Sequence, residues 1–317
     1  MFDRERARSR LAGCYVTVPT MFRDPDLEVD YAATRRNVRF LLDGGIRLGT
    51  GVLLAVGAAG DFSTMTFEER VRTAEAICEE AAGQTALVMG AQTTSTRELV
   101  RLARAAERLG AEYIQVSPPF YFHHTAEDFY EYVLAAAEAA PIGIVVYNTF
   151  WTSSGVSFGM LERLCKIPNV IGLKWATPWS VSMEFERVID EFRDHLCVID
   201  NHMHFVSSHI LGARGFEVHV CNFWPEWGVQ LIESLRERRY AEVQQQMMQV
   251  AVPFYKLWSE IEREYTSGDG YLDKLCMELV GLDSSRSRPP TRDIRGLYRE
   301  KARQMLLKAG VPRVKTA

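Results

Sequence analysis

The feature that most constrains the fold is a regular alternation of short apolar runs with amphipathic stretches of helical period. Eight runs are rich in β-branched and other apolar residues, and each precedes a helical or loop stretch. Strand and helix alternating in this way predict a parallel sheet, and eight such repeats over roughly 200 residues close a TIM (β/α)8 barrel. The expected strands are residues 14–18, 51–57, 86–91, 113–118, 142–148, 170–176, 196–200 and 216–222.

The ends of this architecture are marked by local signals. Thr66 and Glu69 have the spacing of a capping box and predict the start of a helix. From residue 228 onward the pattern is helical throughout. We therefore expect an α/β barrel over residues 1–227 and a C-terminal helical extension over residues 228–317, packed on the barrel as a single structural unit.

Composition sets the class of protein. The 317 residues are 47% hydrophobic and 25% charged, which indicates a soluble globular enzyme with a substantial core. A net charge of -4 and a pI near 6.0 give no electrostatic reason to expect nucleic acid or a membrane as partner. The charged N-terminus and the lack of a long apolar run predict a cytoplasmic protein. Six cysteines without a C-x-x-C pair predict reduced, mostly buried thiols.

One lysine lies where a charge is costly. Lys174 is embedded in the apolar run VIGLKWA, on the same face of the expected strand as Val170 and Gly172. An unpaired buried ammonium costs several kcal/mol, so such a group loses its proton or finds a carboxylate. The first outcome gives an amine that can attack a ketone to form a Schiff base, and the second gives an ion pair inside the barrel. We expect Gly172 to leave room for a long side chain or a ligand.

Two other strand ends can supply partners for this lysine. Tyr147 ends the fifth run, and neighbouring parallel strands lie about 5 Å apart, so its phenol can reach Lys174 and shuttle protons at an imine. A core tyrosine bonded to backbone is the alternative. Residues 57–60, Gly-Ala-Ala-Gly, form a small-residue turn whose N–H groups can hold a carboxylate, although such turns are common in barrels.

Taken together, these motifs resemble the dihydrodipicolinate synthase and N-acetylneuraminate lyase family of class I aldolases. The resemblance covers nearly the whole chain and includes VGAAGDFSTMTFEER, SPPFYFH, the Tyr-Asn after the fifth run and GARGFEVHVCN. It implies a TIM barrel with a helical C-terminal extension, a homo-oligomer (tetramer or dimer), no cofactor, and an imine with pyruvate or another 2-oxo acid. The roles it implies are Lys174 as nucleophile, Tyr147 as proton shuttle, Tyr121 as completion of the relay, Gly57, Ala58, Ala59 and Gly60 as carboxylate turn, and Glu217 at the pocket wall.

The chain departs from the family pattern at two places. Ala58 and Ala59 stand where the family has threonines, which keeps the N–H donors and removes two hydroxyls. After the fifth run the chain lacks the arginine that would bind a second carboxylate, so we do not expect the lysine-pathway condensation with aspartate semialdehyde. Aromatic residues expected at the pocket rim favour a less polar or aromatic aldehyde; they are Phe150, Trp151, Trp175, Trp179, Phe223 and Trp224.

Three histidines suggest a rival chemistry. His202 and His204 form an H-x-H at the end of the seventh run, and His219 lies in the eighth. An H-x-H on a barrel strand can bind a divalent metal, with Asp200 and Glu217 as further ligands. Matching ligands are missing at the other strand ends, so we expect no metal. His202 or His204 then hydrogen-bonds substrate hydroxyls or a leaving carboxylate, or only packs.

The sequence therefore predicts a class I lyase that joins Lys174 to a 2-oxo acid as a Schiff base and makes or cleaves a carbon–carbon bond with an aldehyde. Two alternatives stay open. One is a Schiff-base dehydratase or decarboxylase of a sugar-derived 2-oxo acid. The other is a non-catalytic relative that only binds a ligand.

Overall fold

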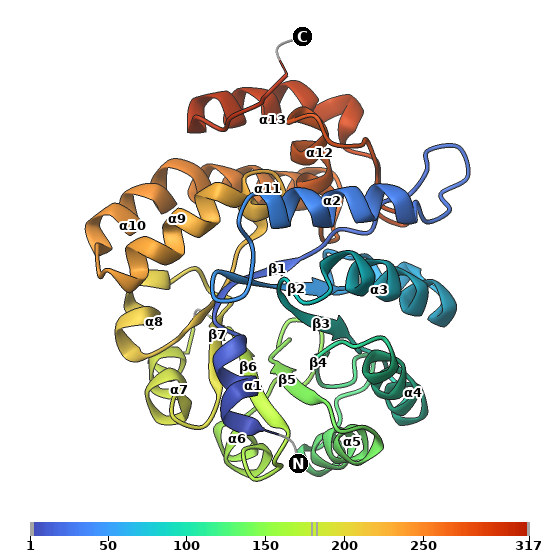
Figure 1. The fold of residues 1–317 in the computed structure, drawn as a ribbon, viewed down its shortest axis with the longest axis vertical. Helices are drawn as coiled ribbons and strands as arrows, with labels where there is room; N and C mark the ends of the chain where they lie inside the picture. Colours follow the sequence, from blue (N-terminus) through green and yellow to red (C-terminus); the bar gives the residue numbers. More distant parts are fainter. Residues whose placement is uncertain (1–2, 179, 182, 316–317) are drawn as a thin grey trace. The chain divides into compact units, whose positions relative to one another are not determined.

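Eight strands close into a barrel in the order β1 to β8, and the described strand pairs are parallel (Figure 1). The computed structural model describes residues 3–178, 180–181 and 183–315. This confirms the predicted TIM barrel. The strands are β1 (Gly13–Thr17), β2 (Gly51–Ala55), β3 (Ala86–Gly90), β4 (Tyr113–Val116), β5 (Gly143–Tyr147), β6 (Val170–Trp175), β7 (Cys197–Asp200) and β8 (Gly215–Glu217).

Helices alternate with the strands and continue alone after β8. The helices are α1 (Arg4–Arg10), α2 (Tyr31–Asp43), α3 (Phe67–Ala81), α4 (Thr96–Arg108), α5 (Ala126–Ala139), α6 (Phe158–Leu164), α7 (Glu184–Phe192), α8 (Phe205–Leu211), α9 (Pro225–Arg236), α10 (Tyr240–Gln246), α11 (Val252–Glu264), α12 (Tyr271–Leu279) and α13 (Arg295–Ala309). Short helical turns are η1 (Phe62–Thr64), η2 (His219–Asn222) and the π-helical η3 (Met247–Ala251). None of the helices in the described ranges has the length and apolar character of a transmembrane span.

Local sequence signals fix several helix starts. Thr66 Oγ1 accepts a hydrogen bond from the Glu69 N–H, and the Glu69 carboxylate accepts one from the Thr66 N–H. This confirms the predicted capping box, which satisfies two N–H groups that the first turn of a helix leaves without partners. Thr125 and Asp128 form a second box at α5.

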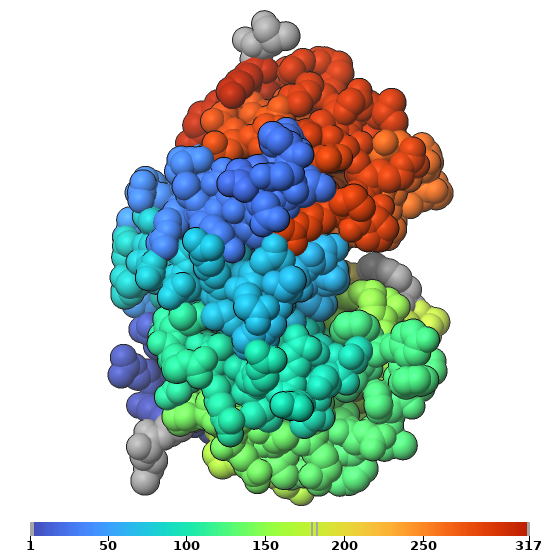
Figure 2. All heavy atoms as spheres, turned by 90° about the vertical axis from the view of Figure 1, so that its right-hand side faces the viewer, coloured from blue at the N-terminus to red at the C-terminus, as the bar shows by residue number. Residues whose placement is uncertain are grey.

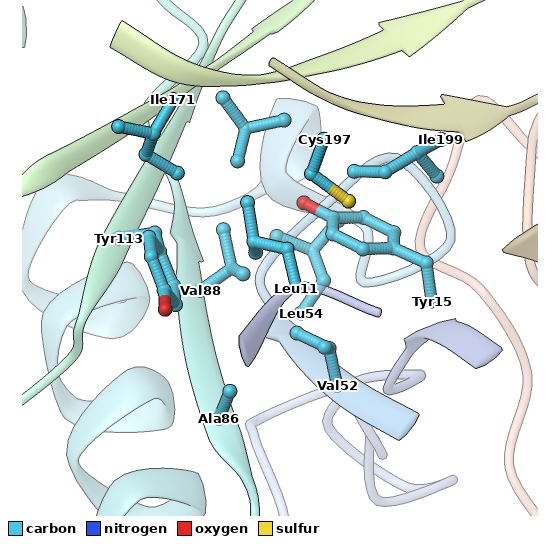
Figure 3. Close-up of a cluster of buried hydrophobic side chains, with 11 residues drawn as sticks. Leu11, Tyr15, Val52, Leu54, Ala86, Val88, Tyr113, Ile171, Cys197 and Ile199 are labelled. Atoms are coloured by element: carbon cyan, nitrogen blue, oxygen red, sulfur yellow. The ribbon is translucent and has the colours of Figure 1, made fainter. Parts of the chain in front are cut away.

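The strands are buried along their whole length, as expected when a sheet is covered on both faces. Figure 3 shows the cluster that fills the barrel interior. Leu11, which follows α1, enters this cluster: a Cβ on Gly172 would lie 2.8 Å from Leu11 Cδ1 and 2.9 Å from Val145 Cγ2. The space expected beside Gly172 for a ligand is therefore filled by side chains. The cluster contains Leu11, Tyr15, Val52, Leu54, Ala86, Val88, Tyr113, Val145, Ile171, Cys197 and Ile199.

The β5–β6 register determines which residues of β6 face inward. Tyr147 pairs with Lys174 and Val145 with Gly172, but the next pair passes over Ile171, which joins the interior cluster. A bulge of this kind breaks the two-residue alternation. The predicted shared face of Lys174 and Gly172 is confirmed, but its extension to Val170 is wrong because Ile171 takes the inward position.

The chain forms two compact units that interleave in sequence. Unit 1 contains the described residues of 1–15, 47–54 and 85–217, and unit 2 those of 16–46, 55–84 and 218–317. Within unit 1, α4 to α7 follow one another outside β4 to β7 (Figure 1). The barrel boundary expected at residue 227 and the packing of the extension on the barrel stay predictions.

Unit 2 joins segments far apart in sequence. Figure 2 shows the segment after β1, in blue, against the C-terminal segment, in orange and red. The Phe22 N–H donates to Ser285 Oγ at 2.8 Å, and Arg36 Nε lies 2.8 Å from the Asp283 carboxylate. A hydrogen bond and an ion pair therefore fix the C-terminal residues onto α2 and the segment before it.

Candidate active site

Lys174 lies buried near the C-terminal end of β6, with only 4% of its surface exposed. Its Nζ is 2.7 Å from Oε2 of Glu217, the last residue of β8. The two side chains therefore form a buried ion pair. Of the two outcomes that burial allows, the structure therefore contains the paired one.

Two aromatic rings complete the surroundings of the lysine. Nζ lies 4.5 Å from the ring centroid of Tyr147 and 5.4 Å from that of Tyr15, distances at which a cation is attracted to the ring face. Tyr15 Oη donates to Gln115 Oε1 at 3.0 Å. Burial, and then the charge of Glu217, raise the pKa of Tyr15 well above its usual value. Tyr15 therefore stays a neutral phenol beside the ion pair.

The expected position of Tyr147 next to Lys174 is confirmed by the strand register. Its Oη accepts a hydrogen bond from Asn201 Nδ2 at 3.3 Å, so a side chain from the end of β7 holds the hydroxyl. Trp151 packs its ring edge-on at 5.8 Å from the Tyr147 ring and is 51% exposed. The tyrosine is thus oriented on one side by an amide and covered on another by an indole.

The aromatic residues expected at the pocket rim differ in exposure. Trp175 and Phe223 are fully buried, so their expected place at a rim is wrong because both pack into the interior. Trp151 stacks edge-on with Phe150 at 4.8 Å and is the exposed member. Trp224 is half-buried before α9, and Trp179 lies outside the described residues.

His202 and His204 belong to a small aromatic cluster after β7. The His202 ring lies 5.1 Å from that of Phe185 and 4.8 Å from that of His204. Burial, and then the proximity of His204, lower the pKa of His202, so a neutral ring is favoured. Within the described residues there is no group of three histidine, cysteine or acidic side chains that could hold a metal ion.

Asp200 fixes the backbone beside this cluster. Its carboxylate accepts hydrogen bonds from the His202 N–H and from Ser208 Oγ, both at 2.6 Å. Burial raises its pKa to about 6, although both hydrogen bonds oppose the rise. Asp200 therefore connects the end of β7 to α8 and, in the described residues, does not form part of a metal site.

His219 does not stand in a strand as expected. β8 ends at Glu217, and residues 219–222 form η2 in unit 2. His219 Nδ1 lies 3.1 Å from both carboxylate oxygens of Asp273, and Asn222 Nδ2 donates to Asp273 Oδ1 at 2.9 Å. The strand prediction failed because burial of Val220 and Cys221 is achieved by a helical turn held by side chains.

The turn after β2, described by itself within unit 2, is rigidly built. The Asp61 N–H donates to the Ala58 carbonyl at 2.9 Å, and Thr20 Oγ1 donates to the Gly60 carbonyl at 2.7 Å. Lys274 Nζ lies 2.7 Å from Asp61 Oδ2. Among the described residues the N–H groups of Ala58 and Ala59 have no hydrogen-bond partner, so both can donate to an anion.

Tyr121 is not brought together with the buried Lys174 and Tyr147 in the described chain. It is 86% exposed, has a φ of 95°, and packs edge-on against Phe122 at 4.8 Å. Tyr15, Gln115 and Asn201 carry no sequence signal that marks them as site residues. Tyr15 and Gln115 lie inside strands that are apolar throughout, and only the paired register shows that they point inward.

Comparison with known proteins decides the family. The chain matches the Dihydrodipicolinate synthetase family over residues 10–309. It belongs to this family. A DapA-like lyase of Thermococcus kodakarensis is 28% identical over 304 residues, which are 94% of this chain and 99% of that protein. The protein is therefore a lyase of the dihydrodipicolinate synthase-like family.

Other relatives support the same family and fold. The 4-hydroxy-tetrahydrodipicolinate synthase of Chloroherpeton thalassium is 34% identical over 172 residues, so the match spans 54% of this chain and about half, 55%, of that protein. The crystal structure of dihydrodipicolinate synthase from Aquifex aeolicus has a TM-score of 0.80 at 25% identity, covering 96% and 100% of the two chains. YagE from Escherichia coli, solved in complex with pyruvate, has a TM-score of 0.82 at 21% identity, covering 95% and 99%.

Proposed function

We propose that this lyase is of class I and forms a Schiff base between Lys174 and a 2-oxo acid, then makes or cleaves a carbon–carbon bond with an aldehyde. The supporting observation is the placement of the lysine. Lys174 is buried near the C-terminal end of a barrel strand, where such barrels carry out their chemistry, and its strand neighbour is Tyr147. The family relative YagE, solved with pyruvate, supports a 2-oxo acid as the first substrate.

In the proposed mechanism, the amine of Lys174 attacks the carbonyl carbon of the 2-oxo acid. The carbinolamine loses water, with Tyr147 as proton shuttle, and the resulting iminium accepts the electrons of the bond that breaks. Cleavage releases an aldehyde and leaves an enamine, which Tyr147 or water protonates. The N–H groups of Ala58 and Ala59 are proposed to bind the substrate carboxylate, with Gly57 and Gly60 shaping the turn.

We propose that the aldehyde is less polar than aspartate semialdehyde. The chain has Thr149, Phe150 and Trp151 after β5 in place of a stretch with an arginine, and the exposed Trp151 ring lies against Tyr147. A half-exposed indole there suits an apolar or aromatic aldehyde better than a second carboxylate. Incubation with pyruvate and a panel of aldehydes, followed by product analysis, separates these possibilities. A panel of sugar-derived 2-oxo acids tests dehydration or decarboxylation in the same assay.

The decisive experiment is borohydride reduction in the presence of pyruvate or a larger 2-oxo acid, followed by peptide mass spectrometry. We expect a reduced adduct on the peptide containing Lys174, its loss in Lys174→Ala, and its retention in Lys166→Ala, which removes an exposed lysine of the same unit. Without any adduct from folded wild-type protein, the Schiff-base proposal fails.

Two observations favour a second candidate, a relative that binds ligand without catalysis. The Lys174–Glu217 contact resembles a structural ion pair, and two family hydroxyls are absent at Ala58 and Ala59. In that case pyruvate raises the Tm with neither product nor trapped lysine.

A further inference from the structure

Glu217 brings a carboxylate to the nitrogen that the proposed function makes reactive. It ends β8, is 6% exposed, and places Oε2 2.7 Å from Lys174 Nζ. Its strand partner is the buried Tyr15 of β1. The family resemblance gives a backbone carbonyl at this place on the pocket wall and assigns no role to the side chain.

An ammonium cannot attack a carbonyl carbon, because its lone pair is occupied by a proton. The proton on Nζ must therefore move before the imine forms. The phenols nearest the nitrogen present ring faces to it, at 4.5 Å for Tyr147 and 5.4 Å for Tyr15. Ring faces attract a cation but do not take its proton.

Each phenol hydroxyl has a side-chain partner other than Lys174. Tyr147 Oη accepts from Asn201, and Tyr15 Oη donates to Gln115. The raised pKa of Tyr15 makes it a poor source of phenolate. Among the described contacts of Nζ, the Glu217 carboxylate lies at 2.7 Å and presents an acceptor oxygen that can take the proton.

We propose that Glu217 is the general base, and then the general acid, of imine formation at Lys174. This proposal rests on the proposed Schiff-base function and adds a catalytic residue to it. The family resemblance implies that one of the two hydroxyls missing at Ala58 and Ala59 belongs to the proton relay, and Glu217 offers another group for proton transfer.

The protons and bonds balance within the pair. Glu217 takes one proton from the Lys174 ammonium, and the amine forms a C–N bond to the 2-oxo carbon. A proton then moves from nitrogen to the former carbonyl oxygen through the Tyr147 hydroxyl, which gives a neutral carbinolamine. Glu217 returns its proton to the carbinolamine hydroxyl, the C–O bond breaks, and water leaves. The products are an iminium on Lys174, one water molecule and the Glu217 carboxylate.

The experiment compares the rate at which pyruvate becomes trapped on Lys174 in wild type, Glu217→Gln and Glu217→Asp, with time points quenched in borohydride. A catalytic carboxylate and a passive counter-ion predict different effects of Glu217→Gln on the trapping rate. If Glu217 transfers protons, Glu217→Gln slows trapping by roughly 10²–10⁴-fold and Glu217→Asp retains part of the rate. If it only holds the lysine charged, its removal favours the amine and leaves trapping equal or faster.

The matched control is Glu112→Gln. Glu112 is also a paired carboxylate of unit 1, bonded to Arg10 Nε at 2.6 Å, but it precedes β4 and lies outside the proposed site. We expect it to trap pyruvate at the wild-type rate, which separates proton transfer from the loss of a barrel ion pair. Circular dichroism and thermal melting verify that each variant is folded. If Glu217→Gln does not fold, the trapping rate of Glu217→Asp, which moves the carboxylate away from Lys174, is compared with that of wild type instead.

The outcomes distinguish this proposal from the one on which it rests. No trapped lysine in wild type overturns both. A trapped lysine in wild type with equal or faster trapping in Glu217→Gln overturns the role of Glu217 alone. A trapped lysine in wild type with slow trapping in Glu217→Gln, partial recovery in Glu217→Asp and an unchanged Glu112→Gln supports it.

Discussion

Tyr147 is the phenol nearest the nitrogen at which the proposed imine forms. Its ring lies against the Lys174 nitrogen, and its hydroxyl is held by Asn201. Removing the hydroxyl while keeping the ring therefore isolates proton transfer from packing. Phenylalanine does this with the least change of volume.

We predict that Tyr147→Phe lowers kcat by roughly 10²–10⁴-fold, the usual contribution of a positioned acid–base group. The lysine should still trap pyruvate at equilibrium, since its amine is unchanged. The measurement is steady-state turnover beside borohydride trapping. Tyr113→Phe is the control, because Tyr113 Oη donates to the Ala7 carbonyl at the opposite end of the barrel interior. An unchanged kcat in Tyr147→Phe would remove the tyrosine's role and spare that of the lysine.

Asp200 carries a pH-dependent cost in the folded state. Burial raises its pKa from 3.8 to about 6. Because the pKa is higher in the folded state, folding favours the protonated carboxyl. Its contribution to the free energy of unfolding is present below pH 3.8 and is lost as the pH rises through about 6. At neutral pH the charged form costs up to about 3 kcal/mol relative to acid pH.

We therefore predict that Asp200→Asn gains stability relative to wild type as the pH rises from 4.5 to 7.5. The amide keeps an acceptor for Ser208 or for the His202 N–H but has no charge to bury. Urea unfolding midpoints of both proteins across this range provide the test. A stability difference that stays constant with pH would contradict the prediction.

At the scale of elements, the turn after β2 and helix α12 are joined by a buried ion pair. Asp61 and Lys274 are 2.7 Å apart, with side chains 6% and 1% exposed. Burial raises the pKa of Asp61 and lowers that of Lys274, while their mutual attraction opposes both shifts. Each charge is therefore tolerated because the other is present.

We predict that Lys274→Met destabilises the protein by about 3–5 kcal/mol, since it leaves Asp61 buried without its partner. Adding Asp61→Asn should recover part of the loss, and asparagine suits the φ of 57° at this position. Guanidinium unfolding of both single variants and the double variant gives the coupling. Glu80→Gln, which removes the partner of the exposed Arg39, serves as the surface control and should cost less than about 1 kcal/mol. Additive losses in the double variant would show that the pair is not coupled.

The sequence predicted the helices and strands well where the spacing of apolar residues alone determines which side chains are buried. The eight strands and the Thr66 cap follow from apolar runs and short-range spacing, and the structure has both. The wrong predictions concern residues whose conformation depends on a contact with a residue distant in sequence. Ile171 faces inward because of a bulge against β5, and His219 turns into η2 against Asp273 on α12. Neither partner is visible from the residues around these positions.

For the molecule as a whole, the closed barrel was predictable from the sequence, but the partner of the buried Lys174 was not. Eight repeats fix the strand order, and Lys174 stood out as a charge in an apolar strand. Its partner could not be chosen from sequence, since Glu217 lies on β8 and reaches the lysine across the barrel interior. The contact between Lys174 and Glu217 depends on the strand register and on the lengths of both side chains. Neither residue's neighbours in sequence show that the two side chains meet.

Exposed apolar side chains of the single chain predict self-association. Several large apolar side chains are exposed in the single chain, including Tyr121 at 86%, Phe122 at 68% and Met183 at 73%. Neighbouring exposed aromatics such as Tyr121 and Phe122 are costly in water unless covered, which agrees with the homo-oligomer that the family resemblance implies. Since the chain has a mass of 36.0 kDa, we predict a sedimenting species of about 72 or about 144 kDa, a dimer or a tetramer. Sedimentation velocity over a hundredfold range of concentration tests this, and a 36.0 kDa species at every concentration would contradict assembly while leaving the Lys174 chemistry untouched.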